Sequence, residues 1–497
     1  MAEETLDSFR RTKIVATLGP ATDNPKILKD LISAGADVLR FNFSHGAAEK
    51  QRERVKQVRE IALKLGRCVG IMGDLQGPKI CIESFKEGAV TLAVGQDFVL
   101  DTALASNDGD GACVGVAYPN LINDVRSGDV LLLDDGQIVL EVAMISGSQV
   151  RCRVKEGGIL TDHKGLNKQG GGLSAPALTD KDRIDITAAA ELEMDFVSVS
   201  FARNADDINE ARDLLHAAGG QGHIVAKIER AEAVKNISEI IEASDVIMVA
   251  RGDLAVEIGY AAMTGLQKSL IKQTRAQNKI SITATQMLES MIMHPSPTRA
   301  EVSDVANAVM DGTDAVMLSA ETAVGKFPAQ AVQTMSELCI GAEKHETFRR
   351  PGNHRIEDVF TYIDEAIALA AMYTANHLRV SAIIAFTESG ATSLWMSRVR
   401  SDIPIYAFTR HEATRRRVAL YRGVYPASFD VVRIESGRIY QSAIEVLEKV
   451  GAVRSGDLVL FTSGDMAGIA GRTNTLRILE VGSEGRSNSN SGSEERG

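Results

Sequence analysis

The sequence lacks the features that mark membrane, secreted and disulfide-bonded proteins. No stretch of its 497 residues approaches the roughly eighteen uninterrupted apolar residues of a membrane span, and residues 1–5 have neither the basic nor the apolar region of a signal peptide. The five cysteines are odd in number and include no C-x-x-C pair, which argues against a disulfide framework and against a zinc site. These absences predict a soluble protein of the reducing cytoplasm with no membrane partner.

An excess of positive charge is also missing. A net charge of −11 provides no general field that attracts nucleic acid, so no nucleic-acid partner is expected. The one basic cluster, Arg415, Arg416 and Arg417, either solvates a helix face or has a specific role. Neither the G-x-x-x-x-G-K-[ST] loop nor the G-x-G-x-x-G fingerprint occurs, which excludes the commonest nucleotide-binding folds.

What the sequence does contain is a regular alternation of short apolar runs with amphipathic segments, at a length that suits two to four domains. Eight runs predict strands, at 13–18, 38–43, 69–75, 196–201, 224–228, 246–250, 280–284 and 315–318. The segments between them predict helices at 25–34, 51–65, 182–193, 204–218, 231–242, 262–277 and 298–310. This alternation predicts an α/β fold built on a (β/α)8 TIM barrel, whose catalytic groups lie at the carboxyl ends of the strands.

Changes in composition and in the pattern of apolar residues along the chain predict further domains. Residues 12–78 and 177–344 form the barrel, while 79–176, with short alternating strands and an Asp135-Gly136 hairpin turn, predict an inserted all-β domain. This insert is either a lid over the active site or a passive decoration. The alternation restarts over 345–481, which predicts an open C-terminal α/β domain. Residues 1–11 form an N-terminal segment, and 482–497, without apolar residues, predict a disordered tail.

Charged residues gather at two neighbouring strand ends. Lys227 and Glu229 share strand parity and therefore one face, and Asp253 follows the next apolar strand. An ammonium and two carboxylates at one barrel mouth suit a divalent metal and a phosphate. The alternative is an ion-pair network that only holds the barrel rim together.

Other strand ends contribute groups of the same kind. Arg40, Asn42 and Ser44 share a face and suit a phosphate, Asp74 ends the third strand, and Thr285 ends the seventh. Together these groups predict phosphoryl transfer at one barrel mouth.

Seven strings resemble the pyruvate kinase family, and the resemblance runs from about residue 12 to residue 481. They are TLGP at 17–20, NFSHG at 42–46, GDLQGPK at 73–79, AKIE at 226–229, MVARGDL at 248–254, ATQMLESM at 284–291 and PTRAEVSDVANAV at 297–309. The resemblance implies a glycolytic phosphotransferase that converts phosphoenolpyruvate and ADP to pyruvate and ATP.

The resemblance also implies roles for single residues. By similarity, Glu229 and Asp253 hold Mg²⁺, with Mn²⁺ as an alternative ion, and Lys227, Arg40 and Thr285 are catalytic. It implies substrate contacts by Arg40, Lys227, Gly252, Asp253 and Thr285, nucleotide contacts by Asn42, Ser44, His45 and Lys181, and a monovalent-cation site at Asn42, Ser44, Asp74 and Leu75.

Some positions depart from the family pattern. Lys79 stands where the family has Glu or Lys, and members with lysine there are similar in not requiring K⁺, which implies that this ammonium replaces the ion beside Asp74. Cys81 replaces an arginine that contacts nucleotide phosphate, so nucleotide affinity is expected to be weak. Ala255 replaces glycine and is expected to strain the metal loop, and Val324 replaces lysine.

The C-terminal domain resembles the effector domain of the family, with Thr387, Ser389, Gly390 and Thr392 in a phosphate-binding turn. Because Glu388 and Ala391 stand where basic residues often occur in members that respond to fructose bisphosphate, the expected effector is a monophosphate sugar or nucleotide, or there is none. An allosteric homotetramer is implied by the same resemblance. Two other hypotheses remain, namely another Mg²⁺-dependent barrel enzyme of pyruvate or phosphoenolpyruvate, such as a lyase, and a catalytically weakened regulatory homologue.

Overall fold

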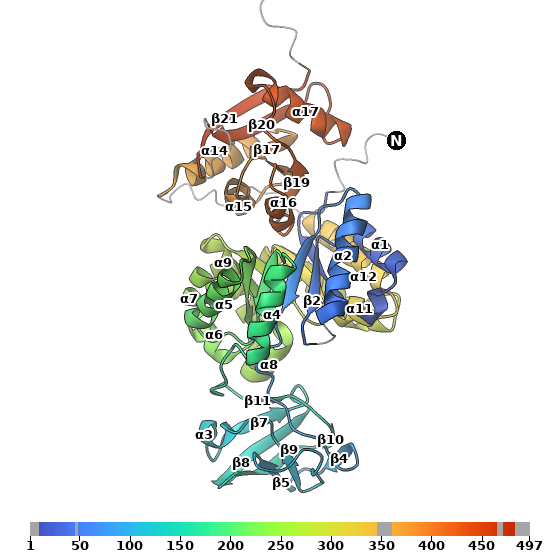
Figure 1. Ribbon diagram of the computed structural model, residues 1–497, viewed down its shortest axis with the longest axis vertical. Coiled ribbons are helices and arrows are strands. Elements are labelled where there is room, and N and C mark those ends of the chain that lie inside the picture. The colour runs from blue at the N-terminus through green and yellow to red at the C-terminus, as the bar shows by residue number, and fades with distance from the viewer. Residues whose placement is uncertain (1–8, 45–47, 345–359, 465–470, 483–497) are drawn as a thin grey trace, which may run out of the picture.

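Three bodies follow one another along the long axis of the molecule (Figure 1). The computed structural model describes residues 9–44, 48–344, 360–464 and 471–482. A closed barrel lies in the middle, with a sheet-rich domain at one end and an open α/β domain at the other. Of the expected terminal segments 1–11 and 482–497, only residues 9–11 and 482 are described.

The predicted (β/α)8 barrel is confirmed. Its strands are β1 (Lys13–Leu18), β2 (Val38–Asn42), β3 (Gly70–Asp74), β12 (Phe196–Val199), β13 (His223–Ile228), β14 (Val246–Ala250), β15 (Ile280–Ala284) and β16 (Ala315–Leu318). They close in the order β1-β16-β15-β14-β13-β12-β3-β2, and every pair is parallel. Because both faces of these strands are covered, runs such as β14 are wholly buried and apolar.

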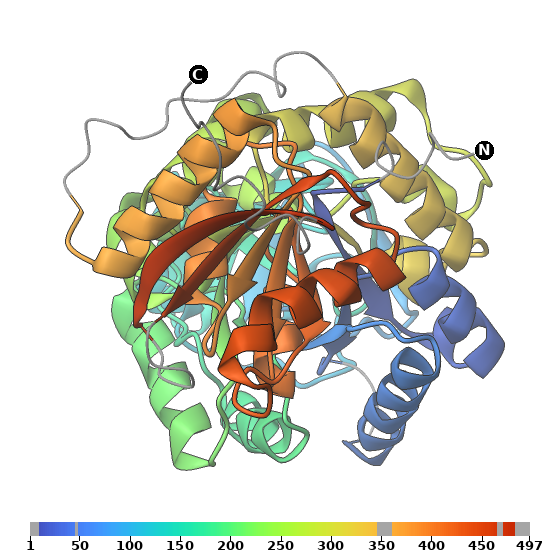
Figure 2. The same cartoon turned by 90° about the horizontal axis from the view of Figure 1, so that it is seen from above.

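A ring of helices surrounds this barrel, as the view along the long axis shows (Figure 2). They are α1 (Pro25–Ser33), α2 (Ala48–Lys64), α4 (Asp180–Glu191), α5 (Ala205–Ala217), α6 (Ala231–Lys235), α7 (Ile237–Ala243), α8 (Arg251–Ile258), α9 (Tyr260–Ala276), α10 (Arg299–Asp311), α11 (Ala320–Ala323) and α12 (Pro328–Glu343), with 3-10 turns η1 (Pro20–Thr22) and η2 (Glu289–Ile292). Two begin with reciprocal side-chain caps, Thr179 with Asp182 and Thr298 with Glu301.

The ring differs from the expectation in two ways. The single helix predicted over 231–242 is two helices that meet at Asn236, and the helices α8, α11 and α12 were not predicted at all. α8 begins directly after β14, so Asp253 lies in its first turn and not at a strand end. A polar Arg-Gly-Asp start hides this helix from a pattern search, because it interrupts the apolar periodicity.

The inserted domain is all β except for the short helix α3 (Leu121–Asp124). Its strands are β4 (Ala89–Leu92), β5 (Asp97–Asp101), β6 (Cys113–Gly115), β7 (Val130–Leu133), β8 (Ile138–Ser146), β9 (Gln149–Glu156), β10 (Gly158–Thr161) and β11 (Leu166–Lys168). The sheets have the orders β11-β7-β8-β9-β5-β6 and β10-β4. The hairpin predicted at Asp135-Gly136 joins antiparallel β7 and β8, and both turn residues have positive φ.

The C-terminal body is the predicted open α/β domain. It contains α14 (Ile363–Leu378), β17 (Ala382–Phe386), α15 (Ala391–Ser397), β18 (Ile405–Thr409), α16 (Glu412–Val418), β19 (Val424–Ser428), η3 (Ser436–Arg438), α17 (Ile439–Lys449), β20 (Leu458–Gly464) and β21 (Thr473–Glu480). Its sheet runs β19-β18-β17-β20-β21, with only β21 antiparallel.

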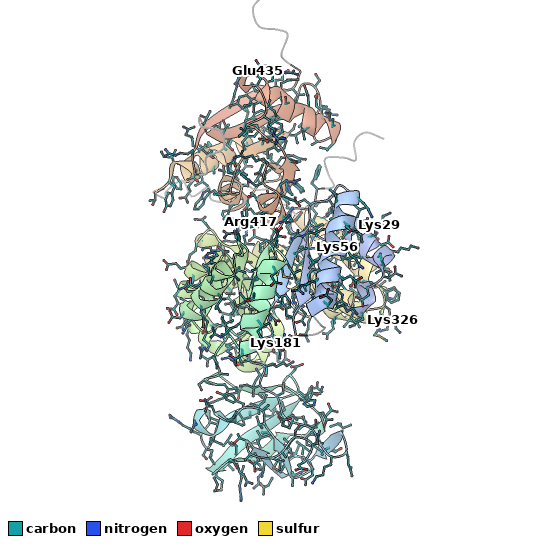
Figure 3. The ribbon with its side chains drawn as sticks, in the orientation of Figure 1. Lys29, Lys56, Lys181, Lys326, Arg417 and Glu435 are labelled. Atoms are coloured by element: carbon teal, nitrogen blue, oxygen red, sulfur yellow. The ribbon has the colours of Figure 1, made fainter. Side chains whose placement is uncertain are left out.

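The basic cluster on α16 attaches this domain to the barrel. Arg416 Nε donates to Asp195 Oδ1 at 2.8 Å, and Arg417 lies against His223, 3.3 Å from its Nε2. Figure 3 labels Arg417 at this junction, at the barrel end opposite the inserted domain. Of the two alternatives, the cluster therefore has a specific role, which is to attach the C-terminal domain to the barrel.

The described residues include all five cysteines, and each thiol is free. Among the helices of the described ranges, not one combines the length and the apolar character that crossing a bilayer demands.

Candidate active site

A cavity of about 330 Å³ opens at the carboxyl ends of the barrel strands. Its lining comprises Thr17, Arg40, Asn42, Lys227, Glu229, Met248, Ala250, Asp253, Thr285, Met317, Ser319, Ala320, Ala323 and Val324. Six of the eight barrel strands have a residue in or just after them in this lining, namely β1, β2, β13, β14, β15 and β16. Four of the charged residues expected at the barrel mouth, Arg40, Lys227, Glu229 and Asp253, thus share one cavity, whereas Asp74 is not among its lining residues.

Three charged residues of this lining form a connected network with the buried Asp74. Arg40 Nε donates to Asp74 Oδ2 at 2.7 Å, and Lys227 Nζ lies 3.5 Å from Asp74 Oδ1 and 2.9 Å from Glu229 Oε1. Burial by itself lowers the pKa of the Lys227 ammonium, but the charges of Asp74 and Glu229 outweigh this effect and the pKa is raised. Lys227 is therefore a fixed positive charge at the floor of the site.

Two hydroxyl residues that sequence reasoning missed hold this network in place. Ser200 Oγ accepts from Lys227 Nζ at 2.8 Å and donates to the carbonyl of Leu75 at 2.7 Å, while Thr17 Oγ1 accepts from Arg40 Nη1 at 3.1 Å. Thr17 could have been found from strand parity, because it is the last residue but one of β1. Leu75 was expected to contact a monovalent cation, but its carbonyl accepts a hydrogen bond from Ser200 here.

Asp253 and Glu229 form a carboxylate pair that fits a divalent cation. Burial, and next the Glu229 charge, raise the pKa of Asp253 to about 6. Within the described ranges no group of three or more His, Cys, Asp or Glu side chains is arranged around a metal position. Two carboxylates are nevertheless a donor set that suits Mg²⁺, which commonly completes its shell with water and substrate oxygens.

Thr285 and Gly252 meet across the site. The Gly252 N–H donates to Thr285 Oγ1 at 2.8 Å, and that hydroxyl donates to the Ala284 carbonyl at 2.7 Å. The adjacency arises because β14 and β15 are neighbours, with Ala250 paired to Ala284. The start of α8 and the end of β15 therefore form one wall.

Some of the residues that were expected to contact nucleotide or a monovalent cation lie close to one another, and others do not. Asn42 lines the cavity and its Oδ1 accepts from the Ser44 N–H at 3.0 Å, whereas Lys181 Nζ donates to the Phe43 carbonyl at 2.7 Å and pairs with Asp185. His45 lies outside the described residues. Figure 3 labels Lys181 on α4, at the barrel end that faces the inserted domain.

A second, smaller cavity of about 30 Å³ lies between barrel and inserted domain. It is lined by Lys79, Asp253 and Glu257, and by Asp135 from the β7–β8 hairpin. In the part of the chain that the structure describes, Asp74 pairs with Arg40 and Lys227 and not with Lys79. The ammonium that was expected beside Asp74 therefore lies across the mouth near Asp253, because the chain turns toward the inserted domain after Pro78.

The carboxyl of Glu257, which lines this second cavity, has a raised pKa. Burial raises the pKa of its carboxyl to about 7, with Glu232 adding to the effect. A carboxyl whose pKa is raised in the folded state stabilises the fold at low pH, and this contribution is lost as pH rises through about 7. Glu257→Gln is therefore expected to raise the free energy of unfolding on the order of 2 kcal/mol at about pH 8, and by little at about pH 5. Thermal unfolding at both pH values checks this, and an equal effect at both would contradict it.

Comparisons with known proteins agree with this arrangement. The barrel-domain profile of pyruvate kinase matches residues 9–332, and the profile of the pyruvate kinase alpha/beta domain matches residues 365–479. The chain is 53% identical over 477 residues to pyruvate kinase II of Salmonella typhimurium, covering 95% of this chain and 99% of that protein. The chain belongs to the pyruvate kinase family.

Other relatives are similar over nearly the same span. A pyruvate kinase of Haemophilus influenzae is 50% identical over 478 residues, covering 95% of this chain and 99% of that protein. One from Staphylococcus epidermidis is 39% identical over 483 residues, or 96% of this chain and 81% of that protein.

The positions that depart from the pyruvate kinase pattern take ordinary places in the fold. Cys81 is half-buried in an isolated antiparallel bridge to Gly165, and burial raises the pKa of its thiol. Ala255 is buried within α8 and has none of the positive φ that would strain it, so the expected strain in the metal loop is not found. Val324 lines the main cavity and is 58% exposed.

The turn expected to bind an effector joins β17 to α15. The Gly390 N–H donates to Thr387 Oγ1 at 2.9 Å, and Thr392, which is buried, shares a hydrogen bond of 2.8 Å with Thr473 of β21. Gly390 has φ of 92°, which the turn requires. Glu388 Oε2 accepts from Arg410 Nε at 3.2 Å and pairs with His411, so its charge is compensated by neighbouring basic groups.

Proposed function

We propose that the chain transfers the phosphoryl group of phosphoenolpyruvate to ADP, giving pyruvate and ATP, in cytoplasmic glycolysis. The observation that carries this proposal is the convergence of Lys227, Arg40, Glu229 and Asp253 on one cavity. Phosphoryl transfer needs positioning and compensation of charge more than covalent help, and this cavity offers both signs of charge. Membership of the pyruvate kinase family supports the same reaction.

Each charged residue has a role in this proposal. Arg40 grips the phosphoryl group, and Lys227 compensates the charge that spreads over its oxygens as the bond to the enol oxygen breaks and the bond to ADP forms. Glu229 and Asp253 would hold Mg²⁺, which when bound supplies Lewis-acid charge to the substrate oxygens. The Gly252 N–H and Thr285 contact the substrate, while Asn42, Ser44, His45 and Lys181 contact the nucleotide.

The test is an assay coupled to lactate dehydrogenase with phosphoenolpyruvate, ADP and Mg²⁺. Pyruvate formation that needs all three components supports the proposal. Binding of these ligands without turnover would instead favour a catalytically weakened regulatory homologue, a hypothesis motivated by Cys81, Ala255 and Val324.

Activity is expected not to require K⁺. Lys79 lies in the cavity that it shares with Asp253, where its charge partly opposes the burial and the Glu229 charge that raise the pKa of that carboxyl, so a fixed cation is already present near the site. Turnover in Na⁺ buffer free of K⁺ should stay within roughly twofold of turnover with K⁺, since the ammonium is a compact point charge. Lys79→Glu is the matched variant and should become dependent on K⁺. A many-fold stimulation of the unmodified protein by K⁺ would refute the expectation.

Nucleotide affinity is expected to improve in Cys81→Arg. A neutral thiol cannot supply a charge-assisted contact to phosphate, and one such contact is worth on the order of 2 kcal/mol, or roughly thirtyfold. The KM for ADP should therefore fall in Cys81→Arg and change little in Cys81→Ser. Steady-state kinetics at saturating phosphoenolpyruvate measure this KM. An unchanged KM in both variants would mean that the position does not contact nucleotide.

Regulation and assembly extend the proposal. Thr387, Ser389, Gly390 and Thr392 would bind the phosphate of an allosteric effector, either a monophosphate sugar or a nucleotide. The assembly is proposed to be a homotetramer, in keeping with the family. Mn²⁺ is proposed as an alternative to Mg²⁺ at the carboxylate pair of Glu229 and Asp253.

A further inference from the structure

Arg251, the first residue of α8, holds the end of β15 through its guanidinium. Its Nη2 donates to the Thr285 carbonyl at 2.7 Å and reaches the Gln286 carbonyl at 3.5 Å, while Nε donates to the Ala284 carbonyl at 3.2 Å. Three successive carbonyls are thus gathered by one side chain that is 9% exposed. None of these bonds belongs to the barrel ladder, because the side chain donates them all.

The segment that Arg251 holds has an unfavourable backbone. Thr285 has φ of 67° and Gln286 has φ of 53°, so two consecutive residues with side chains occupy the left-handed region. Thr is β-branched and adopts this region only when its surroundings impose it. Strained backbone of this kind concentrates at functional sites, where neighbouring groups hold it in place.

Two residues on the outer helices orient the guanidinium of Arg251. Its Nη1 lies 2.7 Å from Asp304 Oδ1 on α10 and donates to Gln267 Oε1 on α9 at 3.3 Å. The planar fork therefore spans from two outer helices to the wall of the cavity, a geometry that a lysine ammonium cannot reproduce. The next residue, Gly252, holds the Thr285 hydroxyl through its N–H.

We propose that Arg251 is a positioning residue that keeps Thr285 in the cavity wall, where its hydroxyl can turn from the Ala284 carbonyl to the methylene carbon of bound enolpyruvate. This role rests on the proposed function. After phosphoryl transfer the enolate electron pair forms a C–H bond with the Thr285 proton as the carbonyl is restored. The Thr285 oxygen takes a proton from solvent in the same step, which is the proton that the net reaction consumes. A displacement of the hydroxyl would slow this step while leaving Arg40 and Lys227 in place for phosphoryl transfer.

The experiment separates the two steps in Arg251→Lys. ATP formation from phosphoenolpyruvate reports phosphoryl transfer, and exchange of the pyruvate methyl hydrogens with D₂O, followed by proton NMR with ATP and Mg²⁺ present, reports proton transfer. Exchange is expected to fall at least ~10-fold more than ATP formation, because catalytic groups lose efficiency steeply with small displacements. Asp304→Asn, which leaves Arg251 in place with Gln267 as its remaining partner on the outer helices, should change the ratio in the same direction by roughly threefold.

The control is Arg416→Lys, which alters a buried, ion-paired arginine at the opposite end of the barrel. It should leave the ratio of exchange to ATP formation unchanged. Should Arg251→Lys not fold, the ratio in Asp304→Asn decides alone. A parallel fall of both rates would mean that Arg251 is only structural and would overturn the inference while the proposed function stands. Absence of ATP formation by the unmodified protein would overturn the proposed function instead, and this role with it.

Discussion

Lys227→Met is expected to lower kcat by at least ~10³-fold, the largest effect of any substitution in the site. The ammonium lies between Asp74 and Glu229 on the cavity floor, so its removal leaves two buried carboxylates with less compensation and a transferring phosphoryl group without its cation. Both changes oppose the approach of an anionic substrate. The coupled assay measures the loss.

The matched control for this variant is Lys268→Met. Lys268 is half exposed and pairs with Asp311 on the outer helices, far from the charge network of the cavity. Its replacement should leave kcat within roughly twofold, since exposed ion pairs contribute little. If Lys227→Met kept more than a tenth of the parent kcat, the electrostatic role of Lys227 would be wrong.

Arg398→Met is expected to destabilise the protein by about 3–5 kcal/mol, the largest stability effect. Arg398 of the C-terminal domain forms a bidentate pair with Asp314 of the barrel, with Nη1 at 3.0 Å from Oδ2, and both side chains are almost wholly buried. Burial raises the pKa of Asp314, but the Arg398 charge outweighs it and the pKa is lowered. The pair therefore stabilises the fold above the usual carboxyl range, and this contribution is lost as pH falls below that range.

The double variant Arg398→Met with Asp314→Leu distinguishes a broken pair from general disruption. Removing one partner leaves an uncompensated buried charge, whereas replacing both by apolar residues is often nearly neutral. Most of the stability should therefore return in the double variant. Calorimetric unfolding of the whole chain provides the comparison, and additive losses in the two substitutions would contradict the account.

The barrel was predictable because its strands are buried on both faces. A continuous apolar run such as β14 agrees with the structure residue by residue, since it suits a covered parallel strand. In the C-terminal domain the apolar pattern predicts strands at 382–386, near 404–408 and at 458–462, which are β17, β18 and β20. It misses β19 and β21 because they are only partly buried, and β19 contains Pro426. Partial exposure removes the apolar signal on which the prediction depends.

The site was predictable where strand parity alone determines direction. Parity placed Lys227 and Glu229 on one face, and their ion pair of 2.9 Å follows from it. Parity could not place Lys79, because the chain leaves the barrel at that point for the inserted domain. Nor could it find Arg251, whose role depends on a helix that the pattern did not indicate and on Asp304 in a distant helix.

In the proposed function, Glu229 and Asp253 together hold the catalytic divalent ion beside Lys227. This can be tested with crystals grown with Mn²⁺ and phosphoenolpyruvate and measured at a wavelength where manganese scatters anomalously. We expect one strong anomalous peak within ~2.5 Å of a carboxylate oxygen of each residue, and its loss in Glu229→Gln. A manganese peak elsewhere, with these two carboxylates empty, would contradict it.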